Sequence, residues 1–96
     1  MELDRKKILD VVIKALREAQ YEIGENNENI AESTKPIGDL KYFDSLSSVY
    51  VTVHCLDTLG YNEELKMPSL FIDKEGNALT VGRVVDEILK LFRKNN

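Results

Sequence analysis

Three stretches of this 96-residue chain repeat their apolar side chains at the spacing of an α-helix, and this pattern constrains the fold more than any other feature. Near the N-terminus, one apolar stripe predicts a helix that starts near Asp4. Its members are Ile8, Val11, Val12, Ala15, Leu16 and Ala19. Near the C-terminus, Thr80 can cap a last helix that has a stripe of its own. That stripe comprises Val81, Val84, Val85, Ile88, Leu89 and Phe92. We therefore expect a helical bundle.

The third apolar-periodic stretch lies mid-chain and follows a long polar segment. From Tyr21 to Phe43 the chain is rich in Gly, Asn and Pro, which is typical of a long loop. Helical spacing then runs from Leu46 to Leu59, and Gly60 can end that helix because glycine readily adopts the left-handed conformation. The expected core draws on all three helices: Val12, Leu16, Val51, Cys55, Leu59, Val85, Ile88 and Phe92.

The stretch after the middle helix is the least constrained part of the chain. Met67-Pro68 interrupts it, residues 69–73 have a strand-like composition, and residues 74–77 read as a turn. For residues 69–73 an extended segment, a distorted helix and a loop all stay open. We predict one all-α domain over residues 1–96. It would have three main helices, a short or irregular third segment, and a long loop between the first two helices.

Charge and hydropathy narrow the classes of function. The net charge is −4, with 17 acidic against 13 basic residues, so the chain offers no basic footprint for nucleic acid or for a membrane surface. No apolar run approaches the length of a membrane span, and Glu2 and Asp4 stand where a signal peptide has basic residues. We expect a monomeric cytoplasmic protein with protein partners and without membrane insertion.

The single cysteine and the single histidine are adjacent, as His54-Cys55. They are too few for an internal disulfide or a zinc site. Adjacent residues of a helix also point in different directions, so a catalytic cysteine–histidine pair is not expected. We predict a core position for Cys55 and a surface position for His54, with no metal site and no enzymatic activity.

Asp44-Ser45-Leu46 opens the middle helix and is the candidate for chemistry. A serine at a helix N-terminus lies beside free backbone N–H groups and the positive end of the helix dipole, which favour a phosphate ester. For three isolated residues the alternative is simple helix capping, since Ser and Asp are both favoured N-caps. Serine-hydrolase chemistry is not expected, because no Gly-x-Ser-x-Gly motif is present and His54 lies nine positions beyond Ser45.

Together with the helical pattern on both sides, this triplet resembles that of the acyl carrier protein family. The resemblance covers roughly Ile37 to Phe92. It is densest at Asp44-Ser45-Leu46, Val49, Val51, Leu59, Met67-Pro68, Thr80-Val81, Val84, Val85 and Ile88. It implies an acyl-carrier-like bundle with phosphopantetheine attached covalently to Ser45, Asp44 beside the ester and Leu46 as an apolar contact. The implied partners are a phosphopantetheinyl transferase, an acyl-loading ligase or transferase, and downstream biosynthetic enzymes.

The chain departs from the family pattern at three places. Residues 40–43 carry an extra residue before Asp44, and residues 69–77 look like an insertion. Neither change affects the modification site. The third departure is chemical: fatty-acid carriers have many acids on this helix, whereas here Asp57 is the only one between Leu46 and Leu59. We therefore expect a specialised pathway rather than ordinary fatty-acid synthesis.

The middle helix carries two apolar stripes, and both cannot face one small core. The second stripe consists of Leu46, Val49, Val53 and Leu56, with Tyr50 beside them. By spacing alone it is the better core candidate, but the family resemblance assigns the first stripe, Val51, Cys55 and Leu59, to the core. The other stripe would then form an exposed apolar patch near Ser45, and such patches usually mark interaction sites. The predicted partner-binding residues are Val49, Tyr50, Val53, Leu56 and Asp57. The alternative is that residues 69–77 fold over this stripe and bury it.

Two functions of different classes follow. The first is a discrete acyl carrier protein that holds an acyl or aminoacyl group as a thioester on phosphopantetheine at Ser45. The second is a helical adaptor that kept the carrier fold and binds partners without a prosthetic group. An adaptor has no need for an exposed serine directly after Asp44, so Ser45 favours the carrier.

Overall fold

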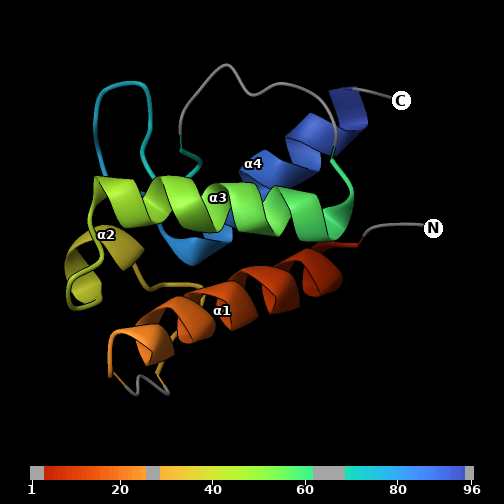
Figure 1. The fold of residues 1–96 in the computed structure, drawn as a ribbon. Coiled ribbons are helices and arrows are strands. Elements are labelled where there is room, and N and C mark those ends of the chain that lie inside the picture. The colour runs from red at the N-terminus through yellow and green to blue at the C-terminus, as the bar shows by residue number, and fades with distance from the viewer. Residues whose placement is uncertain (1–3, 26–28, 62–68, 95–96) are drawn as a thin grey trace.

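The computed structural model describes residues 4–25, 29–61 and 69–94, and within these ranges the chain forms an all-α bundle. Its helices are α1 (Arg5–Glu22), α2 (Pro36–Asp39), α3 (Ser45–Leu59) and α4 (Val81–Lys94). Helix α1 packs against both α3 and α4, and the short α2 lies beside the start of α3 (Figure 1). The expectation of a small helical bundle is confirmed. Met67-Pro68, which contributed to the family resemblance, lies outside the described residues.

Each main helix begins at a side-chain cap. The Asp4 carboxylate accepts the Lys7 N–H at 2.8 Å, and the Asp44 carboxylate accepts the Ser47 N–H at 2.9 Å. The Thr80 hydroxyl accepts the Arg83 N–H at 3.2 Å, as its position in the sequence predicted. Helix α3 ends at Gly60, whose φ of 82° is the left-handed conformation that glycine adopts without strain.

The core combines the faces of α1, α3 and α4 with a few loop residues. Six of the eight predicted core residues are buried: Val12, Leu16, Val51, Cys55, Val85 and Ile88. The other two, Leu59 and Phe92, are partly buried against the same cluster. The long loop contributes Ile30, Leu40 and Phe43, and the segment after α3 contributes Leu70 and Phe71. The segments outside the main helices thus supply part of the hydrophobic core.

One assignment on α3 is wrong, because Leu56 is buried, with 4% of its surface exposed. The core face of α3 carries Ser48, Val51, Thr52, Cys55 and Leu56. These positions follow one helical stripe, in which two hydroxyl residues take places expected for apolar ones. Leu56 follows Thr52 on that stripe and faces the core. It is therefore removed from the predicted partner-binding set.

Residues 69–79 form an extended, hairpin-like segment that packs on α3. Ile72 and Ala78 pair in an isolated antiparallel bridge, and the Leu79 N–H donates to the Phe71 carbonyl at 2.9 Å. The Asp73 carboxylate closes the turn by accepting the N–H groups of Glu75 and Asn77 at 2.9 and 2.8 Å. Of the three alternatives left open by the sequence, the extended segment is the one observed.

Thr52 joins this segment to α3 and provides a stability test. Its buried hydroxyl donates to the Ser48 carbonyl at 2.7 Å and accepts the Leu70 N–H at 3.1 Å. Thr52→Val keeps the shape but leaves the buried Leu70 N–H unpaired, so the free energy of unfolding should fall by about 1–3 kcal/mol in urea titrations. Thr58→Val is the matched control, because the Thr58 hydroxyl also donates to a carbonyl one turn back but is exposed. It should change stability by less than about 0.5 kcal/mol. Equal losses in the two variants would show that Thr52 does not anchor the segment.

Candidate functional site

Ser45 is the first residue of α3 and is exposed, while the capping role belongs to the residue before it. Asp44 has extended backbone, and its carboxylate accepts the Ser47 N–H. The Asp44 carbonyl also accepts the Ser48 N–H at 3.0 Å, which starts the helical ladder. Of the two capping candidates in the triplet, Asp44 is therefore the cap. The Ser45 hydroxyl is left facing solvent at the positive end of the helix dipole.

The carboxylate beside Ser45 is held in its charged form. The Ser47 backbone N–H, and after it the Ser47 hydroxyl, lower the pKa of Asp44 from its ordinary value. An ionised acid next to a helix N-terminus also interacts favourably with the dipole. At neutral pH the site therefore presents a hydroxyl and a negative charge on neighbouring residues.

This lowered pKa predicts a pH dependence of the α3 cap. Because the folded-state pKa of Asp44 lies below the unfolded value of 3.8, its contribution to stability is present above that value and is lost as pH falls through the folded pKa. Asp44→Asn keeps a capping oxygen that does not titrate. In urea titrations the wild type should be more stable than Asp44→Asn at neutral pH, and the difference should shrink in acid. A difference that stays constant with pH would contradict this role of the charge.

A buried hydroxyl network of Ser48, Thr52 and Ser69 lies behind the site. The Ser48 hydroxyl donates to the carbonyl of Ser45 itself at 2.7 Å, and the Ser69 hydroxyl donates to the Ser48 hydroxyl at 3.0 Å. The Phe71 N–H then donates to the Ser69 hydroxyl at 3.0 Å. The backbone of Ser45 is thus connected to residues 69–71. Sequence reasoning missed the network because it drew the expected core from apolar residues and Cys55 and considered no buried serine or threonine. The helical spacing of Ser48 and Thr52 with Val51 and Cys55 was the available signal.

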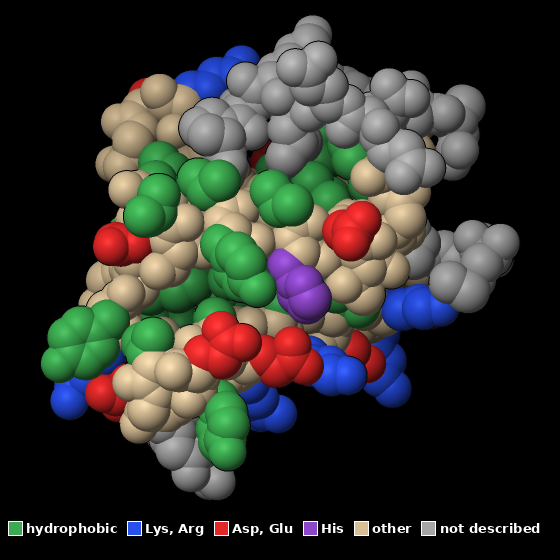
Figure 2. All heavy atoms as spheres, in the orientation of Figure 1, with side chains coloured by type: hydrophobic (Ala, Val, Ile, Leu, Met, Phe, Trp, Pro, Cys, Tyr) green, Lys and Arg blue, Asp and Glu red, His purple; other side chains and the backbone are tan. Residues whose placement is uncertain are grey.

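The outer side of α3 carries an α3 apolar face, defined by Leu46, Val49, Tyr50 and Val53. Leu46, Tyr50 and Val53 have exposed fractions of 79%, 62% and 59%, and Val49 is half-buried. Residues 69–77 therefore do not bury Tyr50 or Val53. Asp57, the fifth predicted contact, is exposed on the same helix. Figure 2 shows this side of the molecule, where apolar side chains lie beside the histidine and acidic side chains lie next to both.

His54 lies at the surface, as predicted, and borders this face. Its ring stacks on Tyr50 with centroids 6.4 Å apart and planes 4° apart, and its Nε2 lies 3.8 Å from Glu18 Oε2. Cys55, by contrast, is buried, and burial raises the pKa of its thiol to about 12. The thiol is therefore neutral at physiological pH and packs as a small apolar group. The two residues do not form a reactive pair.

No family model, no curated protein and no solved structure matches this chain. The function must accordingly be argued from the residues around Ser45. Within the described ranges, no three or more His, Cys, Asp or Glu side chains gather as a metal site. None of the helices in the same ranges combines the length and apolar character that crossing a membrane requires.

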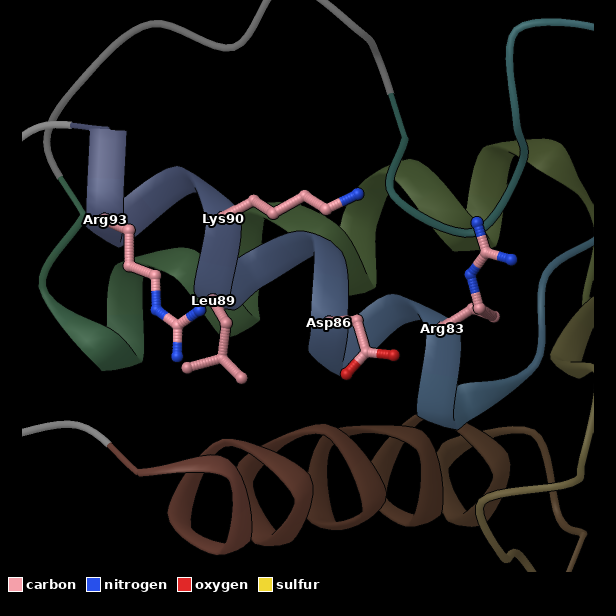
Figure 3. Close-up of a pocket in the computed structure, with 5 residues that line it drawn as sticks. All are labelled: Arg83, Asp86, Leu89, Lys90 and Arg93. Carbon is pink, nitrogen blue, oxygen red and sulfur yellow. The ribbon is translucent and has the colours of Figure 1, made fainter.

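A shallow hollow on α4 is a separate feature. Its described lining comes from α4: Arg83, Asp86, Leu89, Lys90 and Arg93. Arg83 and Lys90 extend away from α1, whereas Asp86 points toward it (Figure 3). There the Asp86 carboxylate accepts a hydrogen bond from the Arg5 Nε at 3.2 Å. The hollow is a charged surface on one helix face, and no α3 residue contributes to its described lining.

Proposed function

We propose that this protein is a carrier in which Ser45 is the attachment point for phosphopantetheine. The observation that supports this most is the division of roles at the start of α3. Asp44 caps the helix, so the exposed Ser45 hydroxyl is not needed for folding. A residue of this type, exposed at a helix N-terminus, suits attachment of a phosphodiester because the first-turn N–H groups and the dipole favour negative charge.

The residues around Ser45 fit such a group. Leu46 is exposed beside the serine and offers an apolar contact to the arm. Asp44, held ionised by Ser47, is placed to assist a transferase and its magnesium, as the corresponding acid does in the family that the chain resembles. When bound, the arm supplies a terminal thiol that holds an acyl or aminoacyl group as a thioester. The protein itself presents that group and performs no chemistry on it.

The α3 apolar face is the proposed contact surface for partner enzymes. These are the phosphopantetheinyl transferase, the loading ligase or transferase, and downstream enzymes of a specialised cytoplasmic pathway. Tyr50 and Val53 provide exposed apolar area, with Val49 and Asp57 beside them. Because apolar area outweighs charge on this helix, recognition should depend weakly on ionic strength. The same face could also serve an adaptor without a prosthetic group, which is the second candidate function.

Enzymatic modification separates the two candidates. The unmodified protein, incubated with coenzyme A, magnesium and a promiscuous phosphopantetheinyl transferase, should gain the mass of one arm, and peptide mapping should place it on Ser45. Ser45→Ala should abolish the gain and leave the far-UV circular dichroism unchanged, because Asp44 caps the helix. Ser47→Ala, a nearby serine variant, should still be modified. If wild type stays unmodified with several transferases, the carrier proposal fails and the adaptor takes its place. An arm on Ser47 instead would overturn the assignment of Ser45 as the attachment point.

A further inference from the structure

Gln20 is a buried amide that joins α1 to the loop before Ser45. It lies in the last part of α1 with only 2% of its surface exposed. Its Nε2 donates to the Lys41 carbonyl at 3.1 Å, and its Oε1 makes no hydrogen bond within the described part of the chain. Burying an amide with an unpaired oxygen is costly. Within the described residues, the hydrogen bond to Lys41 is therefore the interaction that offsets part of the cost of burying this amide.

The loop that Gln20 contacts contains a strained residue. Tyr42 has a φ of 59°, which lies in the left-handed region. Within the described ranges, every other residue with a positive φ is a glycine. Bulky side chains disfavour that region, so such a conformation persists only where neighbouring contacts fix it. The turn is anchored on both sides by the buried side chains of Leu40 and Phe43, and the Phe43 N–H donates to the Leu40 carbonyl at 3.3 Å.

The turn sets the entry of the chain into the candidate site. Phe43 is buried, and Asp44 follows it directly as the cap of α3, with Ser45 next. A change in the turn at Tyr42 must therefore move Asp44 or strain the burial of Phe43. Gln20 is the side chain that binds the backbone of this turn, through the Lys41 carbonyl.

We propose that Gln20 is a positioning residue for Ser45: by holding the Lys41 carbonyl it fixes the left-handed turn at Tyr42 and so orients Asp44 and Ser45 for the modifying enzyme. The role at Ser45 rests on the proposed carrier function. The anchoring of the turn does not, and it can be measured by itself.

A double-mutant cycle tests the role at Ser45. Gln20→Met keeps a long side chain in the buried site but removes the donor to Lys41. It should lower kcat/KM for phosphopantetheinylation by about tenfold, measured at a temperature where circular dichroism shows every variant folded. Glycine adopts the left-handed conformation without strain, so in a Tyr42→Gly background the loss from Gln20→Met should shrink to about threefold or less. Val12→Ala is the control, because it truncates a buried residue of the same helix away from the turn. It should lower the melting temperature but keep kcat/KM within about twofold of wild type.

Amide hydrogen exchange tests the turn without reference to function. Exchange at the Phe43 N–H should be faster in Gln20→Met than in wild type and should be unchanged in Val12→Ala under conditions of local opening. Unchanged exchange in Gln20→Met, or a loss of rate that Tyr42→Gly does not reduce, overturns the proposal. Faster exchange with an unchanged modification rate also overturns it, while the carrier function stands. If wild type accepts no arm at all, the carrier function fails, and with it the role of Gln20 at Ser45.

Discussion

Leu56→Glu should unfold this protein, whereas Val53→Glu, one turn earlier on the same helix, should leave it folded. Leu56 is 4% exposed and packs in the core with Cys55 and Val51. The substitution loses about 1.5–3 kcal/mol of apolar burial and adds the penalty for an unpaired buried carboxylate. The total loss is comparable with the free energy of unfolding of a whole domain, which is roughly 5–15 kcal/mol.

Far-UV circular dichroism and thermal melts distinguish the two variants. Leu56→Glu should lose the helical signal or its cooperative transition at room temperature. Val53 is 59% exposed, so its glutamate stays in water and the melting temperature should move by no more than about 4 °C. A folded Leu56→Glu protein, or an unfolded Val53→Glu protein, would mean that the faces of α3 are assigned the wrong way round.

Helices α1 and α4 could be predicted from sequence because each buries a single stripe. Ile8, Val12 and Leu16 recur at helical spacing on α1 and are fully buried, and Val85 and Ile88 do the same on α4. The sequence also predicted where these two helices begin, because Asp4 and Thr80 are residue types that favour the N-cap position. Local rules were sufficient where the apolar side of a helix coincides with its core side.

Helix α3 could not be assigned by the same rule, because its core side is partly polar. Ser48 and Thr52 are fully buried, and their hydroxyls bond to carbonyls of the preceding turn. They also bond to residues 69 and 70, which lie far along the chain. The spacing of apolar residues does not indicate which distant residues will form hydrogen bonds with these two hydroxyls. Leu56 was placed on the wrong side because the family resemblance, and not the apolar spacing, decided which stripe of α3 was assigned to the core.

The candidate site divides in the same way. The start of a helix at Asp44-Ser45 follows from local sequence, as does the turn at residues 74–77, whereas the exposure of Tyr50 was expected from the family resemblance. The contact of Gln20 with Lys41 joins segments 21 residues apart, and the left-handed conformation of Tyr42 depends on it and on two buried neighbours. The sequence therefore predicts that Ser45 lies at the start of a helix, but it does not predict the contacts between distant segments that we propose orient the serine.

Residues 69–71 are buried in the core, although no residue after the middle helix and before the last one was among the expected core residues, and Phe71→Ala should reveal their contribution. Phe71 is 1% exposed, and its ring meets Phe43 edge-on with centroids 5.7 Å apart. Phe43 immediately precedes Asp44, so the aromatic pair lies behind the start of α3. Truncating Phe71 leaves a cavity there and should lower the free energy of unfolding by about 3–5 kcal/mol in urea titrations.

The matched control is Tyr50→Ala, which removes an aromatic ring that is 62% exposed. It should change stability by less than about 0.5 kcal/mol, because it opens no cavity. A loss below about 1 kcal/mol for Phe71→Ala would mean that the segment covers the bundle without supporting it. If the expected loss is found, the same cavity should speed amide exchange at Phe43, because the Phe43 ring loses its partner. Stability and the geometry of the site would then depend on one aromatic contact between two segments that are distant in sequence.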